Sequence, residues 1–196
     1  MEFAQLDLNK IYSYADYYKW KFEDRVELIK GRIFKMSPSP ASAHQVIKRE
    51  ISGQLWQFLK GKKCQVFSAP LNVRFPGKSI EDKDILTVLQ PDLFVVCDPD
   101  KIDKKGCLGA LDIVIEILSP LNSEKELKFR YAVYEESYVK EYWVVFPDEK
   151  TLLIYILTNG KFIPSRLMVK SNIVTSEILP GLKLELSEIF PAYDYE

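Results

Sequence analysis

The sequence has few residues of the kinds that cross-link a small chain or bind soft metal ions. Its 196 residues include one histidine, His44, and three cysteines, Cys64, Cys97 and Cys107. The cysteines lack metal-ligand spacing, which excludes a zinc-binding module. Because their number is odd and Cys97 lies in an apolar run, we expect reduced thiols of a cytoplasmic protein rather than a disulfide framework.

The sequence also lacks a long apolar run and an excess of charge of either sign. Residues 1–10 have neither the basic nor the apolar region of a signal peptide, and no apolar run approaches the length of a membrane span. We therefore expect a cytoplasmic protein with no membrane partner. The formal net charge is −1, so any binding to DNA must depend on a local patch rather than on the overall field.

The composition is that of a folded domain. Hydrophobic residues make up 47% of the chain and aromatic residues 13%, which is too much for a disordered protein. A chain of this length can bury one sizeable core. We expect a single domain over 1–196, with an N-terminal helix and hairpin at 1–36, a core at 42–146, and a C-terminal hairpin and tail at 147–196.

One apolar run, from Asp112 to Pro120, is the element around which the chain is organised. It is rich in β-branched residues and ends in Ser-Pro, which is typical of a central strand covered on both faces. Glu116 is the exception within it. An ionised carboxylate in such a place costs roughly several kcal/mol unless it is paired or coordinates a cation.

A second acid, Asp92, is expected beside Glu116. It heads another short apolar run, from Gln90 to Cys97, and follows Pro91, which is tolerated at the start of a strand. Two neighbouring strands that each supply one carboxylate form a plausible site for Mg²⁺ or Mn²⁺. Such an ion activates water and neutralises developing charge in phosphodiester hydrolysis, and a lysine on the next helix completes the arrangement.

The remaining pattern predicts an α/β fold with a helix on either face of a central mixed sheet. We expect a short amphipathic helix within 8–22 and a longer one from Ser42 to Gly61. Hairpin turns are expected at Lys30-Gly31 and Asn159-Gly160, because glycine readily supplies the positive φ that such turns need.

A third helix is predicted to begin at Asn122 or Ser123, either of which can cap it. The strand at 141–146 follows this helix at the length of a right-handed crossover, so it should run parallel to the Glu116 strand. The expected buried stripe of the helix consists of Leu127, Tyr131, Tyr134 and Tyr138.

Several segments, taken in order, resemble the Uma-two family of bacterial endonucleases, a branch of the PD-(D/E)XK nuclease superfamily. The match covers most of the chain and is specific when the segments are taken together. They are Val26 to Gly31, Met36-Ser37-Pro38, His44, Pro91-Asp92, Ile115 to Pro120, Lys128, Tyr131-Ala132 and Glu141 to Val145.

The resemblance implies a restriction-endonuclease-like fold, in which a central mixed sheet is flanked by helices and carries antiparallel hairpins at both ends. It further implies a Mg²⁺-dependent (or Mn²⁺-dependent) endonuclease that hydrolyses DNA. By position, Asp92 and Glu116 would be the metal-binding acids of the superfamily motif, and Glu27 an additional upstream acid. A homodimer is among the assemblies that we consider.

The chain departs from the superfamily pattern at Leu118. A lysine usually stands two residues after the second acid, and here Leu118 occupies that position. The family that the chain resembles shows the same gap. Lys128 on the following helix is our candidate for a relocated catalytic lysine.

Each candidate residue also has a purely structural interpretation. Glu116 could be a buried acid hydrogen-bonded to a helix N-terminus or an arginine, and Asp92 a turn cap beside Pro91. Glu27 could be an exposed strand residue paired with Lys30 or Arg32. Lys128 could pack its stem along Tyr131 with a solvated ammonium. His44 is most simply a polar residue in a first helical turn, with a role at phosphate or metal as the alternative.

Three functions remain open at this point. The first is a Mg²⁺-dependent endonuclease that acts on DNA, with Asp92, Glu116, Lys128 and Glu27 at its site. The second is a catalytically inactive nucleic-acid- or protein-binding module on the same fold, which the near-neutral charge and the leucine at position 118 favour. The third, a structural domain of an assembly, gives no reason for Glu116.

Overall fold

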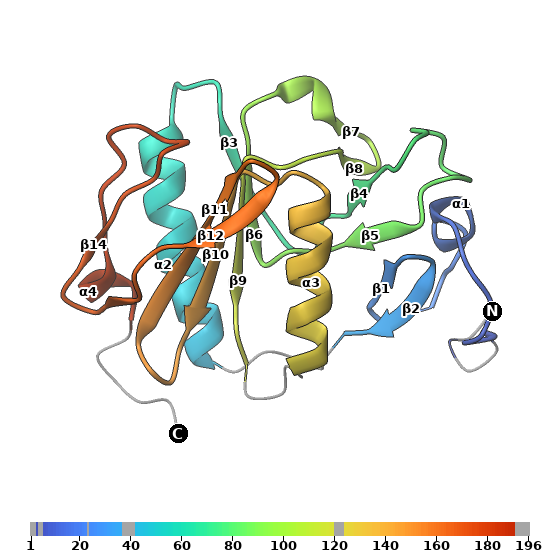
Figure 1. Ribbon diagram of the computed structural model, residues 1–196, viewed down its shortest axis with the longest axis horizontal. Helices are drawn as coiled ribbons and strands as arrows, with labels where there is room; N and C mark the ends of the chain where they lie inside the picture. The colour runs from blue at the N-terminus through green and yellow to red at the C-terminus, as the bar shows by residue number, and fades with distance from the viewer. Residues whose placement is uncertain (1–2, 4–5, 23, 37–41, 120–123, 191–196) are drawn as a thin grey trace.

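The fold is built on two β-sheets, as the computed structural model shows (Figure 1). The structure describes residues 3, 6–22, 24–36, 42–119 and 124–190. The two long helices lie on opposite faces of the larger sheet, and the smaller sheet lies to one side of it. The predicted α/β fold with a helix on either face of a mixed sheet is therefore confirmed.

The larger sheet has seven strands and includes the three predicted central strands. Its order is β12-β11-β10-β9-β6-β3, and β13 pairs with β11. β9 and β10 run parallel, as the crossover predicted, and the other pairs are antiparallel. The strands are β3 Gln65–Ser68, β6 Leu93–Val96, β9 Ile113–Ile117, β10 Glu141–Phe146, β11 Thr151–Thr158, β12 Lys161–Pro164 and β13 Met168–Val169.

The smaller sheet has six strands in the order β2-β1-β5-β4-β8-β7 and was not expected. The N-terminal hairpin was predicted to be an addition to the central sheet, whereas it forms the edge of this second sheet. Most of its strands have only two or three residues, too few for a recognisable alternation. They are β1 Val26–Ile29, β2 Arg32–Lys35, β4 Val73–Phe75, β5 Thr87–Leu89, β7 Ile102–Asp103 and β8 Gly106–Leu108.

The helices differ from the predictions mainly at the N-terminus. The helices are α1 Tyr14–Tyr17, α2 Ser42–Leu59, α3 Glu124–Glu136 and α4 Leu186–Ile189, with a 3₁₀ turn at Pro99–Lys101. The predicted helix within 8–22 is therefore only one turn long. Its regular spacing reflects aromatic packing, since Tyr14, Tyr17 and Trp20 contact one another in sequence. No described helix is long and apolar enough to cross a membrane.

Both predicted hairpin turns are confirmed. Lys30 and Gly31 have φ values of 51° and 77°, and Asn159 and Gly160 have values of 51° and 77°. Positive φ at both central residues is the signature of a type I′ turn, whose twist matches that of the flanking strands. A further two-stranded ribbon, β14 Ile173–Val174 with β15 Leu184–Glu185, precedes α4.

β9 is buried on both faces, as expected for the central strand. Its residues alternate between two hydrophobic clusters: Ile115 packs with Ile51 of α2, and Val114 packs with Val133 and Tyr134 of α3. Glu116 belongs to the α3 side by this alternation. β9 thus directs its one acid toward the helix that follows it.

The buried face of α3 differs in part from the predicted stripe. Tyr134 is fully buried as expected, but Tyr138 lies beyond the end of the helix with 65% of its surface exposed. Arg130 and Val133 are buried instead. The predicted cap at Asn122 or Ser123 falls outside the described residues.

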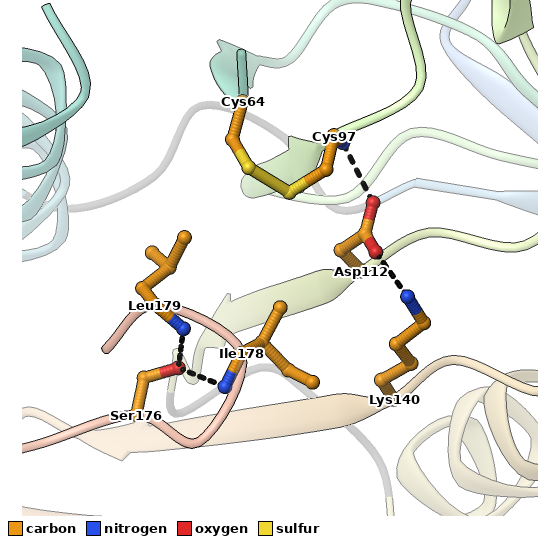
Figure 2. The surroundings of a disulfide bond; sticks show 7 residues. All are labelled: Cys64, Cys97, Asp112, Lys140, Ser176, Ile178 and Leu179. Carbon is orange, nitrogen blue, oxygen red and sulfur yellow. Dashed lines mark hydrogen bonds and ion pairs between the residues drawn. A yellow bond between two sulfur atoms is a disulfide. The ribbon is translucent and has the colours of Figure 1, made fainter. Parts of the chain in front are cut away.

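A disulfide joins Cys64 and Cys97, so the expectation of reduced thiols is wrong for these two residues (Figure 2). They lie one position beyond the ends of β3 and β6, whose antiparallel register pairs Gln65 with Val96. That register brings the two Cα atoms to 3.8 Å, a proximity that cysteine counting cannot reveal. Cys107 is a free, buried cysteine.

The carboxylate of Glu141 fastens the C-terminal segment to β10. Its Oε2 accepts a hydrogen bond from Trp143 Nε1 (2.8 Å). Its Oε1 accepts bonds from the Ser176 hydroxyl (3.0 Å) and from the backbone N–H groups of Glu177 (2.7 Å) and Ile178 (3.2 Å). Only 1% of its surface is exposed. Glu141 and Trp143 of the predicted strand therefore have a structural explanation.

We expect Glu141→Gln to destabilise the fold by roughly 2–4 kcal/mol, because an amide cannot accept all four hydrogen bonds and its NH₂ would face a donor. Chemical denaturation would measure this loss. Glu149→Gln, at an exposed position in the turn before β11, is the matched control and should be nearly neutral. Equal stabilities for the two variants would contradict this role of Glu141.

Candidate active site

The two predicted acids lie next to each other at one end of the β6–β9 pair. Leu93 is paired with Ile115 in an antiparallel register, and the same register continued by one position sets Asp92 opposite Glu116. The Asp92 Oδ2 atom accepts a hydrogen bond from the backbone N–H of Ile117 (2.9 Å). The structure therefore brings the predicted pair of carboxylates together.

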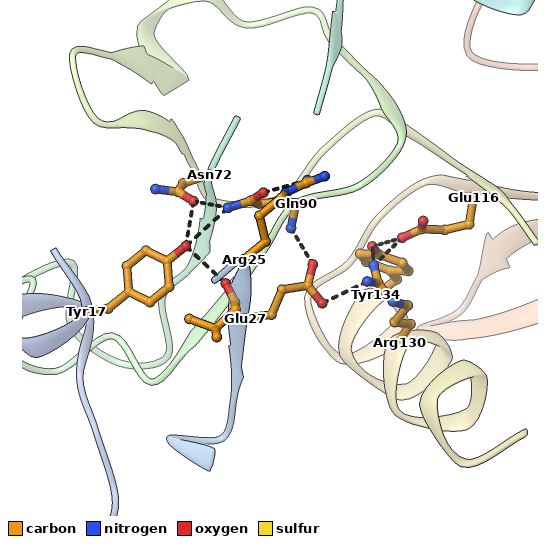
Figure 3. A network of polar contacts seen from close by, with 9 residues as sticks. Tyr17, Arg25, Glu27, Asn72, Gln90, Glu116, Arg130 and Tyr134 are labelled. Carbon is orange, nitrogen blue, oxygen red and sulfur yellow. Dashed lines mark hydrogen bonds and ion pairs between the residues drawn. The ribbon is translucent and has the colours of Figure 1, made fainter. Parts of the chain in front are cut away.

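Arg130 of α3 links Glu116 with Glu27 (Figure 3). Its Nη1 donates to Glu116 Oε1 (2.6 Å), and its Nη2 donates to Glu27 Oε2 (2.7 Å). The Tyr134 hydroxyl also donates to Glu116 Oε1. All four side chains are buried, and Glu27 belongs to the smaller sheet while Glu116 belongs to the larger one. We call this group the Arg130 cluster: Glu27, Glu116, Arg130 and Tyr134.

Glu27 is a buried member of the Arg130 cluster rather than an exposed strand residue. Only 2% of its surface is exposed, so the alternative of a solvated pair with Lys30 or Arg32 is wrong. Its Oε1 accepts a hydrogen bond from the backbone N–H of Gln90 (2.6 Å), two residues before Asp92. The side chain of Gln90 continues the network to Tyr17, Asn72 and Arg25 (Figure 3).

The surroundings shift the pKa values of the two acids in opposite directions. Burial raises the pKa of Glu116 to about 7, and the nearby charges of Asp92 and Glu27 add to the rise, although Arg130 and Tyr134 act against it. Burial also acts to raise the pKa of Asp92. The hydrogen bond and charge of His44, together with the hydrogen bond from Ile117 N–H, act in the opposite direction, and the pKa of Asp92 is lowered. Asp92 therefore carries the more stable negative charge.

His44 contacts the first acid directly. It lies in the first turn of α2 with 6% of its surface exposed, and its Nε2 is 3.1 Å from Asp92 Oδ2. Its buried Nδ1 has no hydrogen-bond partner among the described residues. The interpretation of His44 as merely a polar first-turn residue does not account for this contact. A role at metal or phosphate stays a prediction.

Lys128 and Arg130 lie on different sides of α3. Lys128 is exposed, whereas Arg130 is buried, and two residues correspond to a rotation of about 200° on a helix. The catalytic role of Lys128 stays a prediction. Sequence reasoning missed Arg130, although its place four residues before Tyr134 puts it on the buried stripe. Leu118 is half-buried and packs against the hydrophobic cluster that includes Tyr134.

The donor set fits a divalent ion held by two carboxylates. Among the described residues, both hydrogen bonds to the Asp92 carboxylate are made to Oδ2, and both to the Glu116 carboxylate are made to Oε1. Oδ1 of Asp92 and Oε2 of Glu116 accept no hydrogen bond from this part of the chain. Mg²⁺ is usually bound by one or two carboxylates together with waters and substrate phosphate, rather than by an all-protein cage. No group of three or more metal-ligating side chains occurs in the described part of the chain.

The fold is of the restriction-endonuclease-like class. A solved structure with the same fold is described as a putative nuclease belonging to DUF820 from Anabaena variabilis ATCC 29413, with a TM-score of 0.70 and 22% identity over 91% of this chain and 97% of that one. The model of the Uma2 family, described as "Putative restriction endonuclease", matches residues 14–187. The chain belongs to this family. No curated protein matches it.

The raised pKa of Glu116 has a consequence for stability. The carboxyl holds its proton more tightly in the folded protein than in the unfolded chain, where its pKa is near 4.5. The stabilisation from this group is therefore complete below about pH 4.5 and is lost as the pH rises through about 7.

We expect the free energy of unfolding of the wild type, minus that of Glu116→Gln, to fall between pH 4.5 and pH 8 by on the order of a few kcal/mol. Denaturant titrations of both proteins at matched pH values would measure this difference. Glu188→Gln, at an exposed position, serves as the control and should show no such trend. A difference that is constant or rises with pH would contradict the assignment.

Proposed function

We propose that the protein is a Mg²⁺-dependent endonuclease that hydrolyses phosphodiester bonds of DNA, with Asp92 and Glu116 as the metal ligands. The observation that supports it most is the antiparallel register that pairs these two acids, each with one carboxylate oxygen that accepts no hydrogen bond from the described residues. Membership in the Uma2 family supports the same reaction class.

The protein's own residues have distinct roles in this proposal. Ile117 N–H and His44 hold one oxygen of Asp92, and so fix the direction of the other. Arg130 and Tyr134 do the same for Glu116. A bound Mg²⁺ would supply Lewis-acid activation of water and neutralisation of the developing charge. The preorganised carboxylates then need little rearrangement when the ion binds.

Arg130 reduces the electrostatic cost of assembling three acids in a buried place. Asp92, Glu116 and Glu27 would repel one another if all were ionised, and the guanidinium between two of them offsets this repulsion. The same contact favours a second candidate function, a catalytically inactive nucleic-acid- or protein-binding module. In such a module Arg130 would serve as the permanent counterion of Glu116 in place of a metal.

Cleavage assays on supercoiled plasmid with Mg²⁺ or Mn²⁺ would test the proposal. We expect Asp92→Asn and Glu116→Gln each to lower cleavage by about a hundredfold or more, because each removes a metal ligand. Asp148→Asn, at an exposed position, is the matched control and should cleave like the wild type. We also expect Mn²⁺ to raise the unfolding temperature of the wild type but not of Glu116→Gln.

Two results would count against the endonuclease. A wild-type protein that never nicks supercoiled, branched or single-stranded DNA with either ion would favour the binding module. Cleavage by Asp92→Asn and Glu116→Gln at the wild-type rate would show that the reaction takes place elsewhere in the chain.

A further inference from the structure

Lys48 lies beside the acid pair on the α2 side. It is one helical turn after His44, and its Nζ donates a hydrogen bond to the backbone carbonyl of Ala69 (3.3 Å). The N–H of Ala69 in turn donates to the backbone carbonyl of Asp92 (3.2 Å). The ammonium group is therefore held next to the segment that positions the first acid.

The ammonium charge of Lys48 interacts with the carboxyl groups of both Asp92 and Glu116. Burial lowers the pKa of its ammonium, and the charge of Arg25 lowers it further. The carboxylates of Asp92 and Glu116 act in the opposite direction and raise it. Both predicted metal ligands thus interact with this lysine electrostatically. Partial burial matters here, because a partly desolvated ammonium interacts more strongly with a nearby anion than a solvated one does.

Lys48 is held less tightly than the other cation of the site. Arg130 is fixed by two carboxylates and is 5% exposed, so it cannot turn toward a substrate without leaving buried charges unpaired. Among the described residues, Lys48 forms no ion pair, and its one hydrogen bond goes to a neutral carbonyl. Exchanging that carbonyl for an anionic oxygen would give a shorter and stronger bond.

We propose that the Lys48 ammonium binds a non-bridging oxygen of the scissile phosphodiester and is the catalytic lysine of the site. This inference rests on the proposed nuclease function. A phosphodiester carries a negative charge and would enter next to two carboxylates, so it needs a cation on the protein in addition to the metal. Lys48 would be this cation. It is on α2, which covers the face of the larger sheet opposite to α3, where Arg130 lies.

Lys48→Met tests the inference, since methionine keeps most of the stem and removes the charge. We expect the single-turnover cleavage rate at saturating DNA to fall by about a hundredfold, the shift of unfolding temperature by Mn²⁺ to be kept, and Lys48→Arg to recover part of the rate. Arg49→Met is the matched control, because Arg49 is the exposed neighbour on the same helix and pairs with Glu50. It should cleave like the wild type.

A second measurement does not depend on cleavage. Affinity for a short fluorescein-labelled DNA duplex and for its single strand, with Ca²⁺ in place of Mg²⁺, would be followed by anisotropy at several salt concentrations. We expect Lys48→Met to bind the better of the two probes about tenfold more weakly, with a salt slope reduced by about one, as for the loss of one phosphate contact.

The outcomes separate the two proposals. A wild type that binds DNA with Ca²⁺ and never cleaves would overturn the nuclease, while weaker binding by Lys48→Met would still support the phosphate contact. Wild-type affinity and salt slope in Lys48→Met would overturn the Lys48 assignment, as would an absence of DNA binding by the wild type. Lys128→Met provides the comparison: a large loss of rate there, with full activity in Lys48→Met, would return the role to Lys128.

Discussion

The structure depends on one buried guanidinium. Arg130 donates to Glu27 of the smaller sheet and to Glu116 of the larger sheet, and it comes from the helix that follows the Glu116 strand. Each of the three charges would be costly to bury alone. Together they satisfy one another and fix where the hairpin of β1 and β2 lies against the core. Stability and the geometry of the site therefore depend on the same contacts.

The site lies where elements from distant parts of the chain meet. β9 supplies Glu116, the residue before β6 supplies Asp92, α2 supplies His44 and Lys48, and β1 supplies Glu27. The hydrogen bonds hold one oxygen of each of the two acids that we propose as metal ligands, so the direction of the other oxygen is set by the fold. Such preorganisation suits charge stabilisation in phosphodiester hydrolysis, in which positioning matters more than covalent chemistry by the protein.

The parts of the fold that could be predicted from the sequence are those with a long local signal. The apolar run of β9, the apolar stripe of α2, and the Asn-Gly turn each depend on residues close together in the chain. The proximity of Asp92 and Glu116 also followed, since Glu116 lies on one buried strand and Asp92 directly precedes another. In contrast, the short strands of the smaller sheet have no periodicity to detect.

The remaining features depend on long-range contacts. The cross-strand register that joins Cys64 and Cys97 is a tertiary fact, and Arg130 is understandable only once Glu27, 103 residues away, is known to pack against α3. Lys48 could not be identified for the same reason. Its proposed role depends on its hydrogen bond to the Ala69 carbonyl and on its electrostatic interaction with Asp92 and Glu116, which only the fold brings about. On the sequence alone it is a lysine on a predicted helix, as Lys128 is.

The central claim, that Arg130 joins the two sheets through Glu27, can be tested most directly by a double-mutant cycle. The free energies of unfolding would be measured by denaturation for the wild type, Glu27→Gln, Arg130→Met and the double variant. A coupling energy of about 2 kcal/mol or more is expected, because removal of either partner leaves the other unpaired in a buried place. Effects that add to within about 0.5 kcal/mol would contradict the account.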